Sequence, residues 1–232
     1  MAARALKTAL VTGNTDGIGL FTTRKLLSDG YRVFVHGRSE ARVSKTIEEL
    51  GGGGIKGFVH DLSTREGARA LASDIEKECD DGLDLLINNA GVYEESFTTT
   101  KEGLELTFAV NVQAPFIITH ALLPLLRKKE GARIINISSI SQSDGPTFDI
   151  DNLQFQKGGF TSYASYGMSK RSMAMFSMEL AKKITTEEAL VVSIDPGTVN
   201  TKMLLAGWGR CGIEVEDATN EYHHSTCEWD VR

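Results

Sequence analysis

The chain has 232 residues, of which 41% are hydrophobic and 24% are charged, and its formal net charge at pH 7 is −6. These values suit a single globular α/β domain with a sizeable core. The acidic balance, without any cluster of Lys and Arg, excludes a general nucleic-acid binder.

No apolar run approaches the roughly 20 residues that a membrane-spanning helix needs, and no signal-peptide pattern follows Met1. The cysteines Cys79, Cys211 and Cys227 are widely spaced, which is typical of reduced thiols rather than of a disulfide framework. We therefore expect a cytoplasmic protein without a membrane anchor.

The first predicted strand, residues 6–12, is an apolar run that leads into a glycine-rich segment. A helix is predicted to follow over residues 20–27. Glycines between a first strand and a first helix permit a tight turn whose backbone N–H groups can approach a pyrophosphate, although such a cluster can also be a plain turn. The predicted cofactor contacts in this segment are Gly13, Asn14, Thr15, Gly17, Ile18 and Gly19.

The second predicted strand, residues 31–36, ends at Gly37 and Arg38. In dinucleotide-binding folds an acidic residue at this point binds the ribose hydroxyls of NAD, and here glycine holds that position. The guanidinium of Arg38 suits the 2′-phosphate of NADP, whereas the alternative is an ordinary solvated arginine. We therefore predict a preference for NADP(H) over NAD(H).

Two further predicted strands, residues 55–60 and 83–87, also end in residues suited to a nucleotide. The first ends at a short acid that could accept a hydrogen bond from the adenine amino group. The second leads into Asn-Asn-Ala-Gly at residues 88–91, where small residues let the backbone pass close to a flat ligand. The predicted cofactor contacts here are Asp61, Leu62, Asn89, Ala90 and Gly91.

A long helix is predicted over residues 104–129, with Asn111 among apolar neighbours and a kink near it imposed by Pro115. A buried asparagine needs hydrogen-bond partners, so Asn111 is either structural or part of a polar relay. The fifth predicted strand, residues 133–140, presents Ser138 and Ser139 at its carboxyl end, where ligands of open α/β sheets bind. Residues 141–162 are predicted to form a long loop.

Tyr166 and Lys170 stand four residues apart at the start of a helix predicted to end near residue 184, so both lie on one face of it. A lysine ammonium beside a phenol stabilises the phenolate. We therefore expect Lys170 to lower the pKa of Tyr166 toward neutrality, so that Tyr166 can exchange a proton with a carbinol oxygen. For so short a motif taken alone, an unrelated surface Tyr and Lys is the alternative.

A sixth strand is predicted over residues 190–194. Six strands that alternate with helices predict an α/β fold, a single-domain doubly wound parallel sheet of Rossmann type. The polar segments gather at the carboxyl ends of the strands, and residues 195–201 add a further one after the sixth strand. A seventh strand is doubtful, because residues 202–232 contain no clear apolar strand.

The motifs, taken in order, resemble the short-chain dehydrogenase/reductase family. They are T-G-x-x-x-G-I-G at residues 12–19, N-N-A-G at 88–91, Asn111, Ser139, Y-x-x-x-K at 166–170 and Pro196-Gly197, and the resemblance covers about residues 6–201. It implies that Tyr166 is the general acid/base, that Lys170 lowers its pKa and binds the ribose, that Ser139 bonds the reacting oxygen, and that Asn111 holds a water in a proton relay. It also implies cofactor contacts from Tyr166, Lys170, Pro196, Gly197, Val199 and Thr201, and a possible homodimer through the two long helices.

The 27 positions from Ser139 to Tyr166 are more than the family commonly has. The insertion, with Asn152, Leu153, Phe155 and Phe160, is similar to that of the retinol dehydrogenase-like and WW-domain-oxidoreductase-like branch. Members of that branch act on lipophilic alcohols and carbonyls.

We expect residues 1–201 to form the dinucleotide-binding and catalytic domain and residues 202–232 a short lid and tail. Residues 203–208 are apolar enough to begin a lid, whereas residues 214–232, which include several closely spaced acids, cannot easily bury enough surface to finish it. We therefore expect an open substrate half and poor order in the last dozen or so residues. His223, His224 and Cys227 lack the paired spacing of a structural zinc site, so no metal is expected.

The leading interpretation is an NADP(H)-preferring oxidoreductase that interconverts an alcohol and a carbonyl on a small lipophilic substrate. The competing hypothesis is an NADP(H)-binding protein with little turnover that acts as a redox sensor or interaction module. The short tail favours this competitor, and the intact set Asn111, Ser139, Tyr166 and Lys170 disfavours it. A nucleotide-dependent methyltransferase shares the sheet type but leaves Tyr166 and Lys170 without a task.

Overall fold

A computed structural model describes residues 6–144 and 147–218, in which strands alternate with helices as predicted. The strands are β1 (Thr8–Val11), β2 (Arg32–Gly37), β3 (Gly57–Val59), β4 (Leu85–Asn88), β5 (Arg133–Ile137) and β6 (Leu190–Ile194). The main helices are α1 (Gly17–Ser28), α2 (Glu40–Glu49), α3 (Arg65–Glu78), α5 (Ala114–Leu126) and α7 (Ser162–Lys183). Shorter helical elements are α4 (Leu106–Phe108), η1 (Ala109–Gln113), α6 (Ser141–Asp144), η2 (Ile150–Asn152) and α8 (Lys202–Trp208).

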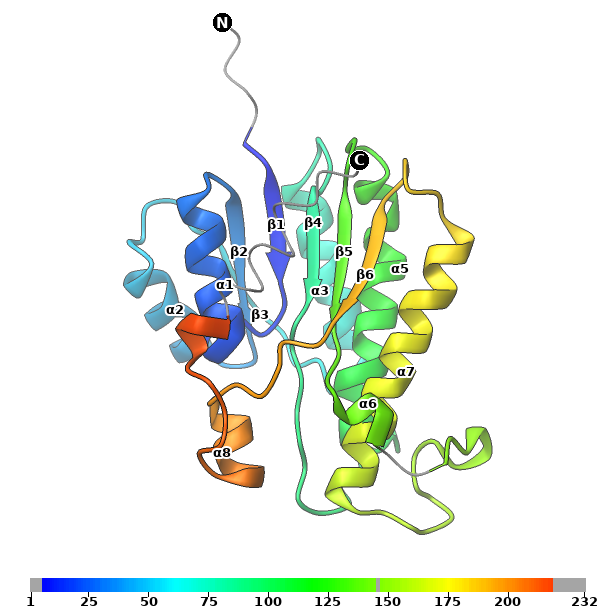
Figure 1. The fold of residues 1–232 in the computed structure, drawn as a ribbon. Coiled ribbons are helices and arrows are strands. Elements are labelled where there is room, and N and C mark those ends of the chain that lie inside the picture. Colours follow the sequence, from blue (N-terminus) through cyan, green and yellow to red (C-terminus); the bar gives the residue numbers. More distant parts are fainter. Residues whose placement is uncertain (1–5, 145–146, 219–232) are drawn as a thin grey trace, which may run out of the picture.

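The six strands form one parallel sheet in the order β3-β2-β1-β4-β5-β6, which confirms the predicted doubly wound fold. Helices cover both faces of the sheet, and the carboxyl ends of the strands share one edge with α6 and α8 nearby (Figure 1). The strand order reverses between β1 and β4. A crevice outside the strand ends at such a switch point is where ligands bind in this class of fold.

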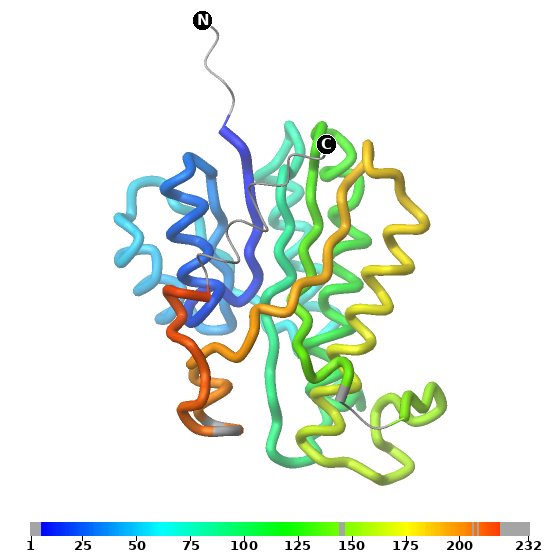
Figure 2. Tube along the Cα trace, in the orientation of Figure 1, coloured from blue at the N-terminus to red at the C-terminus, as the bar shows by residue number. Residues whose placement is uncertain are grey.

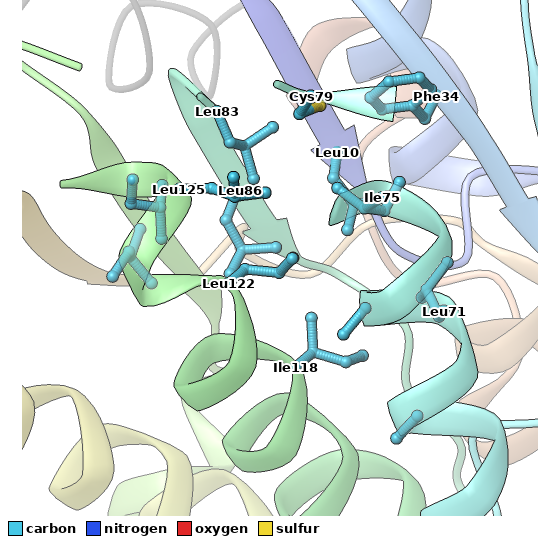
Figure 3. Packing of buried hydrophobic residues seen from close by; sticks show 14 of the residues in the cluster. Leu10, Phe34, Leu71, Ile75, Cys79, Leu83, Leu86, Ile118, Leu122 and Leu125 are labelled. Atoms are coloured by element: carbon cyan, nitrogen blue, oxygen red, sulfur yellow. The ribbon is translucent and has the colours of Figure 1, made fainter. Parts of the chain in front are cut away.

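The core lies on both faces of the sheet, because successive side chains of a strand point to opposite faces. Leu10 of β1 joins a cluster with α3 and α5, whereas Ala9 and Val11 join a second cluster with α1. In the larger cluster Leu71 and Ile118 are fully buried against the sheet (Figure 3). Each such side chain contributes about 1.5–3 kcal/mol of hydrophobic stabilisation.

The predicted long helix runs from Leu106 to Leu126 and contains a π-helical turn at Ala109–Gln113. Pro115 lacks the N–H group that would bond the carbonyl of Asn111, so the predicted local distortion occurs as a wider turn around Asn111. By length and composition this helix could cross a membrane, which corrects the statement that no apolar run is long enough. In this structure Ile118, Leu122 and Leu126 of the helix are buried in the core.

The segment predicted as a loop over 141–162 contains the short helices α6 and η2. Phe155 packs with Ala164 and Met168 in a small core of its own, because the insertion is rich enough in apolar residues to fold back on α7. After β6 the chain runs past the carboxyl ends of the strands to reach α8 (Figure 2).

Residues 202–208 are helical, and a parallel bridge joins Val199 to Ile213. The lid function of this segment stays a prediction. Up to residue 218 no seventh strand is formed. The predicted disorder of the last residues, together with His223, His224 and Cys227, lies outside the described residues.

Candidate active site

A cleft of about 770 Å³ opens at the carboxyl ends of the strands. It collects residues from the segments that follow β1, β2, β3, β4, β5 and β6, together with α7. Of the residues predicted for the site, it is lined by Gly13, Thr15, Gly17, Ile18, Gly19, Arg38, Asp61, Leu62, Asn89, Ala90, Gly91, Ser139, Tyr166, Lys170, Pro196, Gly197, Val199 and Thr201. Asn14 and Asn111 lie behind this lining.

The glycine-rich segment packs directly on the segment after β4. Gly13 has a φ of +65°, and a Cβ there would lie 2.9 Å from the Cα of Ala90. At Gly19 a Cβ would lie 2.5 Å from the Nδ2 of Asn89, which donates a hydrogen bond to the Thr12 carbonyl at 2.8 Å. The loop is therefore held close to the sheet, leaving a groove beside the N-terminus of α1 that fits a dinucleotide.

Asn14 does not enter the cleft, which corrects its prediction as a cofactor contact. The side chain is fully buried; its Oδ1 accepts a hydrogen bond from the backbone N–H of His36 at 2.7 Å. Its Nδ2 donates to Thr23 Oγ1 at 2.8 Å and to the Phe34 carbonyl at 3.0 Å. Asn14 thus joins β2 to α1 beneath the loop, because its side chain turns inward rather than toward the ligand groove.

His36 is a residue that the sequence interpretation missed. It is 2% exposed, and its Nδ1 accepts a hydrogen bond from the backbone N–H of Gly13 at 3.1 Å. Its Nε2 lies 3.3 Å from the His60 carbonyl, which assigns the proton to Nε2. Burial lowers the pKa of His36 to about 4, so it is a neutral acceptor that fixes the glycine-rich loop. The sequence signal for this role was that a polar residue, His36, stands at the end of the second predicted strand.

The end of β2 is tightly packed at Gly37. A Cβ there would lie 2.8 Å from the Cγ2 of Thr15, so a larger residue would have to displace the Thr15 side chain. Arg38 is exposed at the cleft, and Arg42, which was not predicted, lines the same region. The groove at this end therefore carries two guanidinium groups and suits a phosphate.

Asp16 and Lys202 were also not predicted for the site. Asp16 caps α1 by accepting from the backbone N–H of Gly17, and its carboxylate pairs with Lys202 and, at 3.9 Å, with Arg42. Since Lys202 begins α8, this contact joins the start of α8 to the start of α1 across 186 positions of sequence.

Tyr166, Lys170 and Ser139 meet at the floor of the cleft. Helix α7 begins where Thr161 Oγ1 accepts from the backbone N–H of Ala164 at 3.0 Å, and this cap places Tyr166 and Lys170 in the first turns. The Nζ of Lys170 lies 5.4 Å from the ring centroid of Tyr166. Ser139, rather than Ser138, hydrogen-bonds the Tyr166 side chain. Ser138 is buried, and its Oγ donates a hydrogen bond to the Lys170 carbonyl at 3.2 Å.

The expectation that Lys170 lowers the pKa of Tyr166 toward neutrality is wrong for this structure. Burial raises the pKa of Tyr166 to about 12; the Ser139 hydrogen bond opposes the shift, and the charge of Asp195 adds to it. Burial also lowers the pKa of Lys170 to about 8, and Asp195 partly offsets this. The phenol is therefore protonated at neutral pH.

Asn111 is 2% exposed and holds the backbone of Val92 from both sides. Its Oδ1 accepts from the Val92 N–H at 2.8 Å, and its Nδ2 donates to the Val92 carbonyl at 3.0 Å and to Ser169 Oγ at 3.0 Å. A Cβ on Gly91 would lie 3.4 Å from Asn111 Oδ1 and 3.7 Å from Lys170 Nζ. Asn111 and Lys170 thus flank Gly91, while the relay water remains a prediction.

A match to a known protein family shows which family the chain belongs to. The model of the short chain dehydrogenase family matches residues 7–149. The chain belongs to this family. The resemblance read from the motifs is thereby confirmed, including its retinol dehydrogenase-like branch.

Several curated proteins resemble most of the chain. Human retinol dehydrogenase 13 is 31% identical over 201 residues, which cover 85% of this chain and 60% of that protein. Mouse polyprenol dehydrogenase is 34% identical over 213 residues, covering 87% of this chain and 63% of that protein. The chain therefore spans about three-fifths of the length of these relatives.

Among solved structures, the RhlG/NADP active-site complex of Pseudomonas aeruginosa superimposes with a TM-score of 0.70 at 32% identity. The match covers 86% of this chain and 75% of that one. Within the described part of this short-chain dehydrogenase, no group of three or more His, Cys, Asp or Glu side chains is placed to hold a metal ion. Cys79 is buried and Cys211 exposed, both as free thiols.

Proposed function

We propose that the protein is an NADP(H)-preferring oxidoreductase that interconverts an alcohol and a carbonyl on a small lipophilic substrate. One observation carries the proposal. The Tyr166 side chain is hydrogen-bonded to Ser139, and its ring centroid lies 5.4 Å from the Nζ of Lys170. It opens into the cleft that the glycine-rich loop borders. A proton donor and the dinucleotide groove therefore share one cavity.

The residues divide the chemistry among them. Ser139 holds the reacting oxygen beside the Tyr166 hydroxyl, and Tyr166 donates its proton to that oxygen in the reducing direction and takes it back in the oxidising direction. The Lys170 ammonium offsets part of the burial penalty on the phenolate that remains, although burial dominates the pKa of Tyr166 in the protein without substrate. Asn111 holds Val92 and Gly91 against Lys170 and connects the lysine to a relay water. Bound NADP(H) supplies or accepts the hydride.

The cofactor preference rests on the end of β2. The missing side chain at Gly37 removes the acidic ligand that NAD ribose uses, and Arg38 and Arg42 supply positive charge for the 2′-phosphate of NADP. Asp61, whose Oδ1 accepts from the backbone N–H of Ser63 at 2.9 Å, presents a carboxylate at the adenine end.

The substrate end of the cleft is mostly apolar. Its lining includes Val92, Leu106, Val110, Ile140, Met203 and Leu204. Apolar side chains here favour a lipophilic carbonyl over a charged one, because a charged group would lose its hydration without a partner. The names of the similar retinol and polyprenol dehydrogenases support the same substrate class.

The division into a catalytic domain at 1–201 and a lid and tail at 202–232, a cytoplasmic location and a homodimer complete the proposal. For the dimer, α5 and α7 offer exposed Phe116, Met175 and Met178. Light scattering of the purified protein would measure the oligomeric state.

An assay of NADPH oxidation with a panel of aliphatic and aromatic carbonyls tests the function. The expected result is turnover of at least one lipophilic carbonyl with NADPH and slower turnover with NADH. Tight NADPH binding without turnover of any carbonyl would instead support the competing hypothesis, a nucleotide-binding redox sensor or interaction module.

A further inference from the structure

Tyr93, in the segment after β4, packs against the proposed proton donor. Its ring lies edge-on to the Tyr166 ring, with the centroids 5.5 Å apart and an interplanar angle of 66°. The Lys170 ammonium lies 5.4 Å from the centroid of the Tyr166 ring. Edge-to-face pairs at this separation are attractive and restrict ring orientation. Tyr166 is therefore contacted by two neighbours that limit how its ring can turn.

The backbone on both sides of Tyr93 is tied down. Asn111, in the π-helical turn, makes two hydrogen bonds to the backbone of Val92, at 2.8 and 3.0 Å. On the other side, Ser162 Oγ at the start of α7 donates to the Glu95 carbonyl at 3.1 Å. Because Ser162 precedes Tyr166 on the same helix, the backbone on both sides of Tyr93 is anchored relative to the helix that carries Tyr166.

Helix α8 rests on the same ring. A Cβ at Gly207 would lie 3.3 Å from one carbon of the Tyr93 ring and 3.6 Å from two others, so the glycine allows a close approach. The other end of α8 is held where Lys202 pairs with Asp16 at the start of α1. Helix α8 thus spans from the dinucleotide loop to Tyr93, over the substrate end of the cleft.

We propose that Tyr93 is a positioning residue that sets the orientation of Tyr166 and seats α8 over the substrate end. The proposal rests on the proposed function, since it assigns Tyr93 to the proton-transfer step. Its physical basis is the ring: an aromatic group at residue 93 limits the rotation of Tyr166 and supports Gly207 at once. Closure by α8 is thereby linked to the geometry of the proton donor.

Kinetics of Tyr93→Ala, Tyr93→Phe and Phe97→Ala test the role. We expect Tyr93→Ala to lower kcat roughly 10- to 100-fold, the scale of a small misplacement of a reacting group. The Kd of NADPH should stay within about twofold, because Tyr93 does not line the nucleotide groove. Tyr93→Phe, which keeps the ring, should retain most of the wild-type kcat. Loss of kcat in Tyr93→Phe equal to that in Tyr93→Ala would overturn the proposal.

Phe97→Ala is the matched control. Phe97 lies on the same segment, but its ring packs on Phe160 of the insertion with centroids 5.5 Å apart and is 44% exposed. Its removal should leave kcat unchanged. A drop as large as that in Tyr93→Ala would show that any aromatic of this segment matters equally, and would contradict a specific role for Tyr93.

A readout independent of turnover uses ring-¹³C tyrosine NMR. The chain has five tyrosines, and the signals of Tyr93 and Tyr166 are assigned by their Phe variants. Tyr93→Ala should shift the Tyr166 signal, Phe97→Ala should not, and Gly207→Val should shift the Tyr93 signal. An unmoved Tyr166 signal in Tyr93→Ala would overturn the proposal. If the wild type reduces no carbonyl, the proposed function fails, while this spectrum still shows whether Tyr93 packs against Tyr166.

Discussion

The Nζ atom of Lys170 donates a hydrogen bond to the Ile137 carbonyl at 2.8 Å while lying 5.4 Å from the ring centroid of Tyr166. The last residue of β5 thus fixes the ammonium group beside the phenol. Lys170 is only 5% exposed, and its burial lowers its pKa to about 8, so this lysine is close to its titration point at physiological pH.

Replacing Lys170 should change how stability depends on pH. The pKa is about 8 in the folded protein against 10.5 ordinarily, so the unfolded chain binds the proton more readily between these values. The wild type should therefore gain about 2 kcal/mol of unfolding free energy between pH 8 and pH 10 relative to Lys170→Met. Urea unfolding at both pH values measures this, and the exposed Lys182→Met on the same helix serves as the control. An equal pH response in wild type and Lys170→Met would contradict the assigned burial.

His36 predicts a loss of stability in acid. The folded pKa of about 4 lies below the ordinary 6.5, so the stability of the neutral, buried ring is present above pH 6.5 and falls as the pH drops toward 4. Relative to His36→Asn, the wild type should lose about 2 kcal/mol of unfolding free energy between pH 7 and pH 5. His120→Asn, which replaces an exposed histidine, should follow the wild type. Parallel curves for wild type and His36→Asn would refute a neutral His36 in the fold.

Arg38 should select the cofactor. Arg38→Met is expected to weaken NADPH binding by about 1.5–3 kcal/mol, the scale of a charge-assisted hydrogen bond, and to leave NADH binding nearly unchanged. Titration of both cofactors against wild type, Arg38→Met and Arg127→Met measures this. Arg127 pairs with Glu188 and does not line the cleft, so its variant should bind both cofactors normally. Equal losses for NADPH and NADH would show that Arg38 does not read the 2′-phosphate.

Much of this architecture is readable from local pattern. Parallel strands are buried on both faces and appear as short apolar runs, which is why β1 and β5 were located from the sequence. The fold then places the carboxyl ends of these strands at one edge, so residues such as Ser139 and Gly91 could be predicted to share a cleft.

Other features depend on tertiary structure. The spacing of Tyr166 and Lys170 predicts that they are neighbours, but the depth at which they are buried decides the direction of both pKa shifts. Nothing in the glycine-rich pattern shows that the Asn14 side chain turns toward Phe34. The contact of Tyr93 with Gly207 joins positions more than a hundred residues apart, beyond the reach of any local pattern.

The central claim, that Tyr166 is the proton donor of an NADP(H)-dependent oxidoreductase, is tested most directly by Tyr166→Phe. One preparation of each protein is titrated with NADPH and then assayed with the best carbonyl of the panel. The account predicts that kcat falls at least about 100-fold, the scale of general acid–base catalysis, while the Kd of NADPH changes little. Near-wild-type turnover in Tyr166→Phe would contradict it.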